Sequence, residues 1–201
     1  MPAFENTYYR FPSDNYLGIP NILPFQGKYE SCRWIPFNYA NTEKHPEECG
    51  VHFFIDDNMF ERVWTNPYKY VGMLKRFKYV AAPDFSGFDS MPLAAQQFQK
   101  FKKHWVARLW QLHGINVIDV PIWTRKCEYD WQFLAEPKNN VVFISSVGTQ
   151  HAYEYRKSFV NGYNEAIYNL CPRTILFYGN VPEDINTDRI ITQTSHKVFA
   201  M

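Results

Sequence analysis

Short apolar runs alternate with longer stretches of helical spacing between residues 51 and 180, and this alternation restricts the possible folds strongly. The strand-like runs are Val51–Ile55, Tyr79–Ala82, Ile115–Ile122, Val141–Ile144 and Thr174–Tyr178. Strands separated by helices are joined by right-handed crossovers, which leave neighbouring strands parallel. We therefore predict an α/β fold of repeated βα units, with a mainly parallel sheet flanked by helices. Five strands are too few for a standard eight-stranded barrel, which favours an open sheet over a reduced or irregular barrel.

The helical stretches between these runs differ in clarity. Apolar residues from Phe60 to Phe77 recur at helical spacing but are interrupted at Pro67, which breaks a helix. The clearest helix begins after Pro92 and ends before Gly114; its apolar positions are Leu93, Phe98, Phe101, Trp105, Leu109 and Leu112. A further helix is expected from Glu154 to Leu170.

The chain has the length of a single domain, and we divide it into three parts. Residues 1–50 hold six prolines, which exclude long helices, and many aromatic residues, which require burial. We expect an irregular segment, rich in proline and aromatic residues, packed on the α/β core of residues 51–183. Residues 184–201 form a polar extension that adds an edge strand near Ile190 and Ile191.

The overall charge gives no sign of a nucleic-acid or membrane partner. Lys and Arg number 21 against 20 Asp and Glu, so binding to nucleic acid would need a local basic patch. We expect no secretory signal and no membrane span, because no apolar run approaches the roughly 18 residues that a span needs. These features indicate a cytoplasmic protein with free thiols at Cys32, Cys49, Cys127 and Cys171.

Polar side chains follow the predicted strands where the strands end. In parallel α/β sheets, ligands bind at this carboxyl edge, where the sequence places Asp56, Asp57, Asp84, Trp123, Ser145, Ser146, Gly148 and Asn180. Asp56 and Asp84 come from successive units, so we predict that they are catalytic and hold a divalent magnesium or manganese ion. Helix capping is the alternative for both, and for Asp57 it is the favoured interpretation.

The turn from Ser145 to Thr149 offers hydroxyls, backbone amides and a glycine. We predict that Ser145, Ser146 and Gly148 bind a substrate phosphate, with Trp123 and Asn180 beside them at the same edge. The turn lacks the P-loop lysine, and neither serine stands in a nucleophile elbow, so serine catalysis is not expected.

Two other groups of residues have a structural interpretation and a functional one. Lys100, His104 and Arg108 share one helix face that would meet phosphates, although a solvated face is favoured. Of these we retain Arg108 as a substrate-binding candidate. The possible zinc ligands Cys32, His45, Cys49 and His52 lack zinc-site spacing, so His52 is expected to be a core histidine.

Several blocks of the sequence resemble a known family. They are Cys49–Asp57, Phe60–Trp64, Pro83–Ser86, Trp110–Gln111, Gly114–Ile115, Trp123 and Ile144–Gly148. In order and content they are similar to the family catalogued as domain of unknown function 4417, which occurs largely in phages and mobile elements of bacteria. The resemblance implies a phage or prophage protein acting in a bacterial cytoplasm, and it implies no particular reaction. Asp119 and Pro121 depart from the family pattern, and we assign Asp119 no catalytic role.

Three functions remain open at this stage. The first is a hydrolase or transferase that acts on a phosphoester or nucleotide with the help of a metal ion. The second is a binding module without turnover that takes a host protein, a nucleotide signal or nucleic acid, using its first fifty residues and its basic helix face. The third is a component of the virion.

Overall fold

A computed structural model of the chain describes residues 3–87, 90–124, 129–149 and 151–193. Within these residues the strands are β1 (Arg33–Pro36), β2 (Cys49–His52), β3 (Tyr79–Ala81), β4 (Val117–Ile118), β5 (Val141–Ser145), β6 (Thr174–Tyr178) and β7 (Ile190–Gln193). The α-helices are α1 (Arg62–Thr65), α2 (Val71–Leu74), α3 (Leu93–Leu112), α4 (Tyr129–Gln132) and α5 (Tyr153–Leu170). Short 3₁₀ helices are η1 (Ala3–Tyr8), η2 (Phe37–Thr42), η3 (Pro46–Glu48), η4 (Asp57–Met59) and η5 (Pro67–Tyr70).

All strand pairs formed by the described residues are parallel, and the strands lie side by side in chain order. β1 to β4 form one sheet and β5 to β7 form another. A single parallel bridge between Asp119 and Val142 joins the two where β4 meets β5. The predicted α/β fold with a parallel sheet is confirmed.

The combined sheet is curled. Contacts between side chains of distant strands on its inner face show this. Trp34 of β1 lies 4.5 Å, centroid to centroid, from Phe143 of β5, and His52 of β2 lies 4.6 Å from Tyr178 of β6. In a flat sheet four strand spacings would separate each pair by about 19 Å. Gly50 of β2 makes room for the Trp34 ring, since a Cβ there would lie 2.6 Å from it.

The curled sheet stays open between its edge strands β1 and β7. No strand pairing joins these two strands in the part of the chain that the structure describes. A long hydrogen bond of 3.4 Å from the Tyr29 hydroxyl to Gln193 Oε1 spans the gap. Among the described residues the sheet is therefore open, as the sequence favours, and it is not a closed barrel, although its strand order is that of a barrel.

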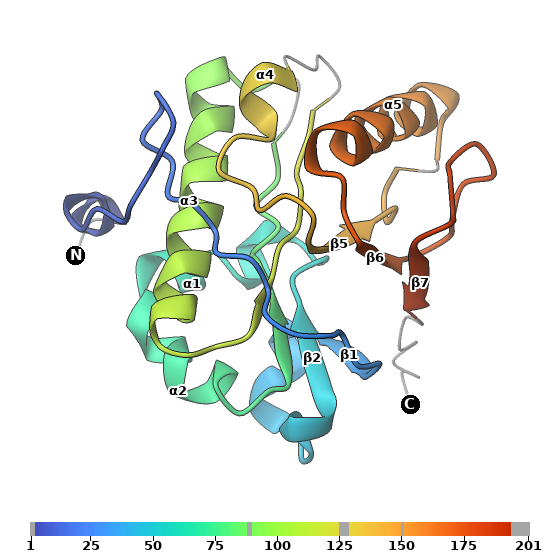
Figure 1. The fold of residues 1–201 in the computed structure, drawn as a ribbon. Coiled ribbons are helices and arrows are strands. Elements are labelled where there is room, and N and C mark those ends of the chain that lie inside the picture. The colour runs from blue at the N-terminus through green and yellow to red at the C-terminus, as the bar shows by residue number, and fades with distance from the viewer. Residues whose placement is uncertain (1–2, 88–89, 125–128, 150, 194–201) are drawn as a thin grey trace.

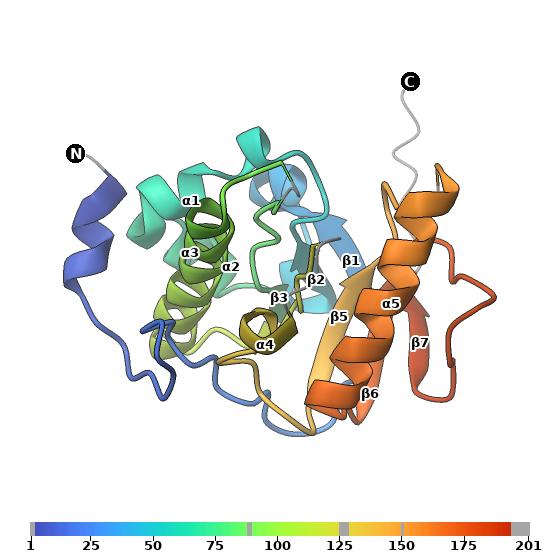
Figure 2. The same cartoon turned by 90° about the horizontal axis from the view of Figure 1, so that it is seen from above.

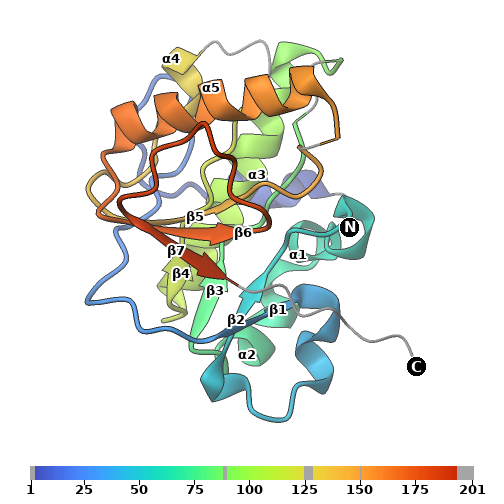
Figure 3. The same ribbon diagram turned by 90° about the vertical axis from the view of Figure 1, so that its right-hand side faces the viewer.

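Helices cover the outer face of the curled sheet (Figures 1 and 2). In Figure 2, α1, α2 and α3 lie beside β2 and β3, while α5 runs along β5 and β6. α3 buries Trp105, Leu109 and Trp110 in the hydrophobic cluster that also contains side chains of β1 to β4. α5 packs Phe159 and Tyr163 into a cluster with apolar side chains of β5 and β6. Figure 3 shows the helix lying across these two strands. Because the helices occupy the outer face, the ends of the strands are left to form a site.

The segment from residue 60 to 77 breaks into short pieces instead of one long helix. α1 ends at Thr65, and Pro67 begins the separate turn η5. The first fifty residues also differ from expectation, since they contain β1, a short edge strand that ends in Pro36. Their irregular part runs from the N-terminus across α3 toward β1 (Figure 1). Phe11, Phe25 and other aromatic residues of this part are buried in the core.

Candidate functional site

A cleft of about 390 Å³ lies at the carboxyl end of the curled sheet. The segments that line it follow β2, β3, β4 and β5, and α5 contributes Phe159. The lining includes the predicted site residues Asp56, Asp84, Trp123, Ser145 and Gly148. Residues that lie up to 92 positions apart in the sequence thus meet at one opening, because parallel strands place their carboxyl ends at the same edge.

Asp56 and Asp84 are the charged side chains of this cleft among its described lining residues, and none of the others is Lys or Arg. Asp56 is exposed, and Asp84 is half-buried. Burial, with a smaller contribution from the nearby Asp57 carboxylate, raises the pKa of Asp84 from 3.8 to about 6, although the Lys103 ammonium acts in the opposite direction. The cleft is therefore acidic, and the pKa of one of its carboxyl groups lies close to neutral pH.

Asp57 does not cap a helix, so this prediction is wrong. Its two carboxylate oxygens accept hydrogen bonds from Ser86, one from the backbone amide at 3.0 Å and one from the hydroxyl at 2.9 Å. Asp57 follows β2 and Ser86 follows β3, so this contact ties two neighbouring strand exits together. It fixes the loops that present Asp56 and Asp84.

The turn after β5 uses several of its polar groups internally. The Ser145 hydroxyl accepts the Val147 amide at 3.2 Å, and the Thr149 amide donates to the Ser146 carbonyl at 3.1 Å. Gly148 has a φ of 80°, a conformation that favours glycine. The Ser145 hydroxyl still has its own proton to donate, so it can serve a ligand in the cleft.

Three predicted substrate-binding residues lie outside the lining of this cleft. Ser146 is buried and donates its hydroxyl to the Asn180 carbonyl at 2.7 Å. The guanidinium of Arg108 lies 5.6 Å from the centre of the Phe11 ring and hydrogen bonds to Gln111. The structure thus joins Ser146 to Asn180 beside the cleft and places Arg108 against the N-terminal segment.

The prediction of a solvated basic face on α3 is also wrong. Lys100, Lys103 and His104 are almost fully buried. We call these three residues, with Asp119 and Glu136, the buried ionic cluster. The face is covered because Pro20 of the N-terminal segment and the residues around Glu136 pack over it, and no pattern within the helix reveals such a cover.

Glu136 is the centre of the buried ionic cluster. Its Oε1 atom lies 2.6 Å from Lys100 Nζ, 2.8 Å from Lys103 Nζ and 3.1 Å from His104 Nε2. Lys103 Nζ also lies 2.9 Å from Asp119 Oδ1 and donates to the carbonyl of Val120, a residue of the cleft lining. Burial raises the pKa of Asp119 to about 8 despite this lysine. The cluster therefore contacts the cleft through the Val120 carbonyl that Lys103 holds.

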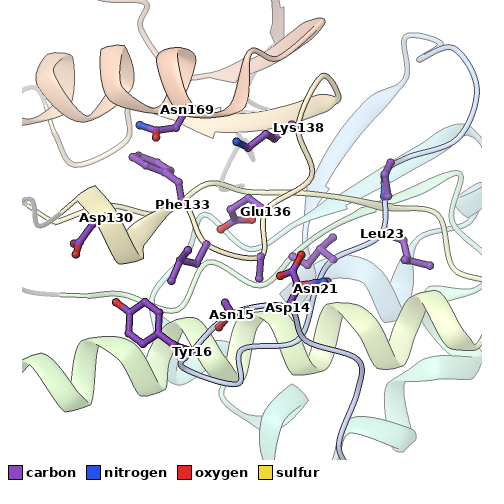
Figure 4. A pocket seen from close by; sticks show the side chains of 14 residues that line it. Asp14, Asn15, Tyr16, Asn21, Leu23, Asp130, Phe133, Glu136, Lys138 and Asn169 are labelled. Atoms are coloured by element: carbon purple, nitrogen blue, oxygen red, sulfur yellow. The ribbon is translucent and has the colours of Figure 1, made fainter.

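A larger hollow of about 650 Å³ lies at the other end of the sheet (Figure 4). Its walls come from the N-terminal segment, from Asp130 of α4, from the residues between α4 and β5 and from Asn169 of α5; Asp14, Asn21 and Glu136 are also labelled in the figure. The Glu136 side chain is fully buried, and its Oε1 atom is held by Lys100 and Lys103. Ligand sites of parallel α/β proteins form at the carboxyl ends of strands, so we place the candidate site in the smaller cleft.

The structure also bears on the possible metal ligands. Within residues 3–87, 90–124, 129–149 and 151–193, no three His, Cys, Asp or Glu side chains come together as a metal site. His52 is buried in the core, where its Nδ1 accepts the Phe54 amide at 3.2 Å and burial lowers its pKa to about 3. Cys32, Cys49 and Cys171 are free thiols as predicted. Cys127 lies outside the described residues.

Comparison with known proteins identifies the family. The chain matches the family described as domain of unknown function (DUF4417) over residues 11–195. It belongs to the DUF4417 family. The Gene 1 protein of Mycobacterium phage D29 is 30% identical over 189 residues, which cover 90% of this chain and 67% of the phage protein. The Gene 1 protein of Mycobacterium phage L5 is 33% identical over 173 residues, covering 85% and 75% respectively.

Both relatives are phage proteins. The name that both carry, Gene 1 protein, states no activity. No solved structure matches the chain. Among the described residues no helix is long and apolar enough to cross a membrane. Function must therefore be argued from the cleft itself.

Proposed function

We propose that this DUF4417 protein is a metal-assisted enzyme, a hydrolase or transferase that acts on a phosphoester or nucleotide in the cytoplasm of a bacterial host. One observation carries the proposal: Asp56 and Asp84 line one cleft, and no Lys or Arg stands among its described lining residues. A phosphate would be repelled by two carboxylates alone. It would be held once a divalent cation lies between it and them.

Two carboxylates suit magnesium or manganese in particular. Mg²⁺ keeps several waters and is commonly bound by one or two carboxylates together with substrate phosphates. Asp56 and Asp84 would supply the protein ligands, and the Ser145 hydroxyl would donate to a phosphate oxygen. The pKa of about 6 at Asp84 lets this group exchange a proton near neutral pH until the metal binds.

The experiment is a manganese titration followed by electron paramagnetic resonance. We expect Asp56→Asn and Asp84→Asn each to weaken Mn²⁺ binding at least about tenfold, which corresponds to ~1.4 kcal/mol. Asp188→Asn is the matched control, because Asp188 is exposed and lies outside the cleft lining. Unchanged Mn²⁺ affinity in both cleft variants would refute the proposal.

A binding module without turnover is the second candidate, and exposed aromatic residues favour it. Tyr8 and Tyr16 of the N-terminal segment are 83% and 75% exposed, as contact residues for a host protein or nucleic acid would be. The basic face of α3 cannot join them, because its lysines are buried. An electrophoretic mobility assay at low salt tests nucleic-acid binding directly, and co-purification with phage particles tests the virion alternative.

A further inference from the structure

Trp123 is held in a fixed position at the wall of the cleft. It follows β4, lines the cleft and packs against Phe159 of α5 with ring centroids 5.6 Å apart. Gly162 of α5 lies so close that a Cβ at this position would overlap the five-membered ring of the indole. Glycine inside a helix costs about 1 kcal/mol relative to alanine. The helix carries this glycine where the indole needs the space.

The indole remains partly exposed although it is packed against the backbone of α5. Phe54, from the segment after β2, and Phe159 add aromatic surface to the same cleft. A rigid, partly exposed aromatic ring binds another planar ring by stacking, which contributes about 1–3 kcal/mol per nucleobase. Inorganic phosphate or a sugar phosphate has no planar ring to use this surface.

The cleft thus combines two kinds of surface. Asp56, Asp84 and Ser145 offer oxygen atoms, while Trp123 and Phe159 offer aromatic rings. A nucleotide has the matching two parts, a phosphate that binds through a divalent cation and a planar base. The volume of about 390 Å³ lies in the range of small-molecule sites.

We propose that the substrate of this cleft is a nucleotide whose base stacks on Trp123, with Gly162 as the residue that lets the indole take its position. This inference rests on the proposed function for the phosphate end of the ligand. It adds the base, the part of the substrate by which the cleft would select a nucleotide over a sugar phosphate. Trp123 is a substrate-binding residue in this account, and Gly162 is a positioning residue that acts through it.

The test is calorimetric titration, with Mg²⁺ present, of the four common ribonucleoside 5′-monophosphates and of ribose 5-phosphate. At least one nucleotide should bind about 5- to 150-fold more tightly than ribose 5-phosphate, the range that stacking of one base provides. Trp123→Ala should abolish this preference, and Trp123→Phe should retain part of it. Gly162→Ala should reduce it while leaving Trp123 in the sequence.

Tyr168→Ala is the control, because Tyr168 is an aromatic residue of α5 that is 81% exposed and lies outside the cleft lining. Equal affinity for nucleotides and ribose 5-phosphate, or a preference that survives Trp123→Ala, would overturn the inference. Mn²⁺ binding by Trp123→Ala should equal that of the unmodified protein. The two proposals can therefore fail separately. If the unmodified protein binds Mn²⁺ through the two aspartates but shows no preference for a base, only this inference fails. The proposed function fails if the two aspartates do not bind the ion.

Discussion

Two groups of acidic side chains differ in the contacts that they make with basic residues. Asp119 and Glu136 are buried and are paired with Lys100 and Lys103. Asp56 and Asp84 face the cleft, with no basic side chain among its described lining residues. Acidic residues thus serve the fold where lysines contact them directly, and they remain accessible to a ligand where, as for Asp84, the nearest lysine acts only at a distance.

The largest expected effect comes from breaking the buried ionic cluster. Lys103→Met leaves Asp119 and Glu136 without a shared cation in a region that water does not reach. We expect unfolding free energy to fall by about 3–5 kcal/mol, the usual result of removing one partner of a buried ion pair. Urea denaturation measures this, with the exposed Lys44→Met as control. A loss below about 1 kcal/mol would show that the cluster is unimportant for stability.

A smaller loss is expected at the tie between the strand exits. Asp57→Ala removes a charged acceptor of two hydrogen bonds from Ser86. Unfolding free energy should fall by about 1.5–3 kcal/mol, as for hydrogen bonds to charged groups. Ser86→Ala removes only the hydroxyl donor and should cost less in the same denaturation experiment. If Asp57→Ala were neutral, the contact would not hold the loops together.

Replacing Asp84, an acid of the cleft, should raise the free energy of unfolding at neutral pH. The pKa of Asp84 is raised to about 6 in the folded protein, so its contribution to stability is complete below pH 4 and is lost as pH rises through 6. Asp84→Asn does not titrate. At pH 7 in the presence of a chelator, the variant should be more stable by about 1–2 kcal/mol, and near pH 3.5 the two proteins should match. Thermal unfolding across this pH range checks the sign, and a destabilised variant at pH 7 would contradict it.

The smallest effect on stability is expected at Asp56. Its side chain is exposed, so Asp56→Asn should change unfolding free energy by no more than about 0.5 kcal/mol. Its Mn²⁺ affinity should nevertheless fall with that of Asp84→Asn. A variant that loses stability but keeps its Mn²⁺ affinity would assign Asp56 to the fold instead of the site.

The sequence predicts much of this fold because the later elements have strong local patterns. β6 and α5 lie where apolar runs and helical spacing place them. β1 could not be found, since four residues that end in proline give almost no strand signal. The curl of the sheet depends on contacts such as that between Trp34 and Phe143, more than one hundred residues apart, and no local pattern reveals such a contact.

The candidate site, too, is predictable only where the sequence has a local pattern. The rule that ligands bind at strand exits predicts that Asp56, Asp84 and Ser145 lie close together, and all three line one cleft. Sequence reasoning missed the buried ionic cluster, because Glu136 stands in no motif and its lysine partners precede it by 33 and 36 residues. Asp119, directly after an apolar strand, and three basic residues on one helix face were the available signals.

The central claim is that the unpaired acids of the cleft, and not the paired acids beneath it, bind the ion that the reaction needs. A crystal soaked with Mn²⁺ tests this directly through anomalous scattering. We predict an anomalous peak between the carboxylates of Asp56 and Asp84, about 2.0–2.3 Å from an oxygen of each, and none at Asp119 or Glu136. A cleft without such a peak at millimolar Mn²⁺, in crystals that leave it open to solvent, would contradict the account.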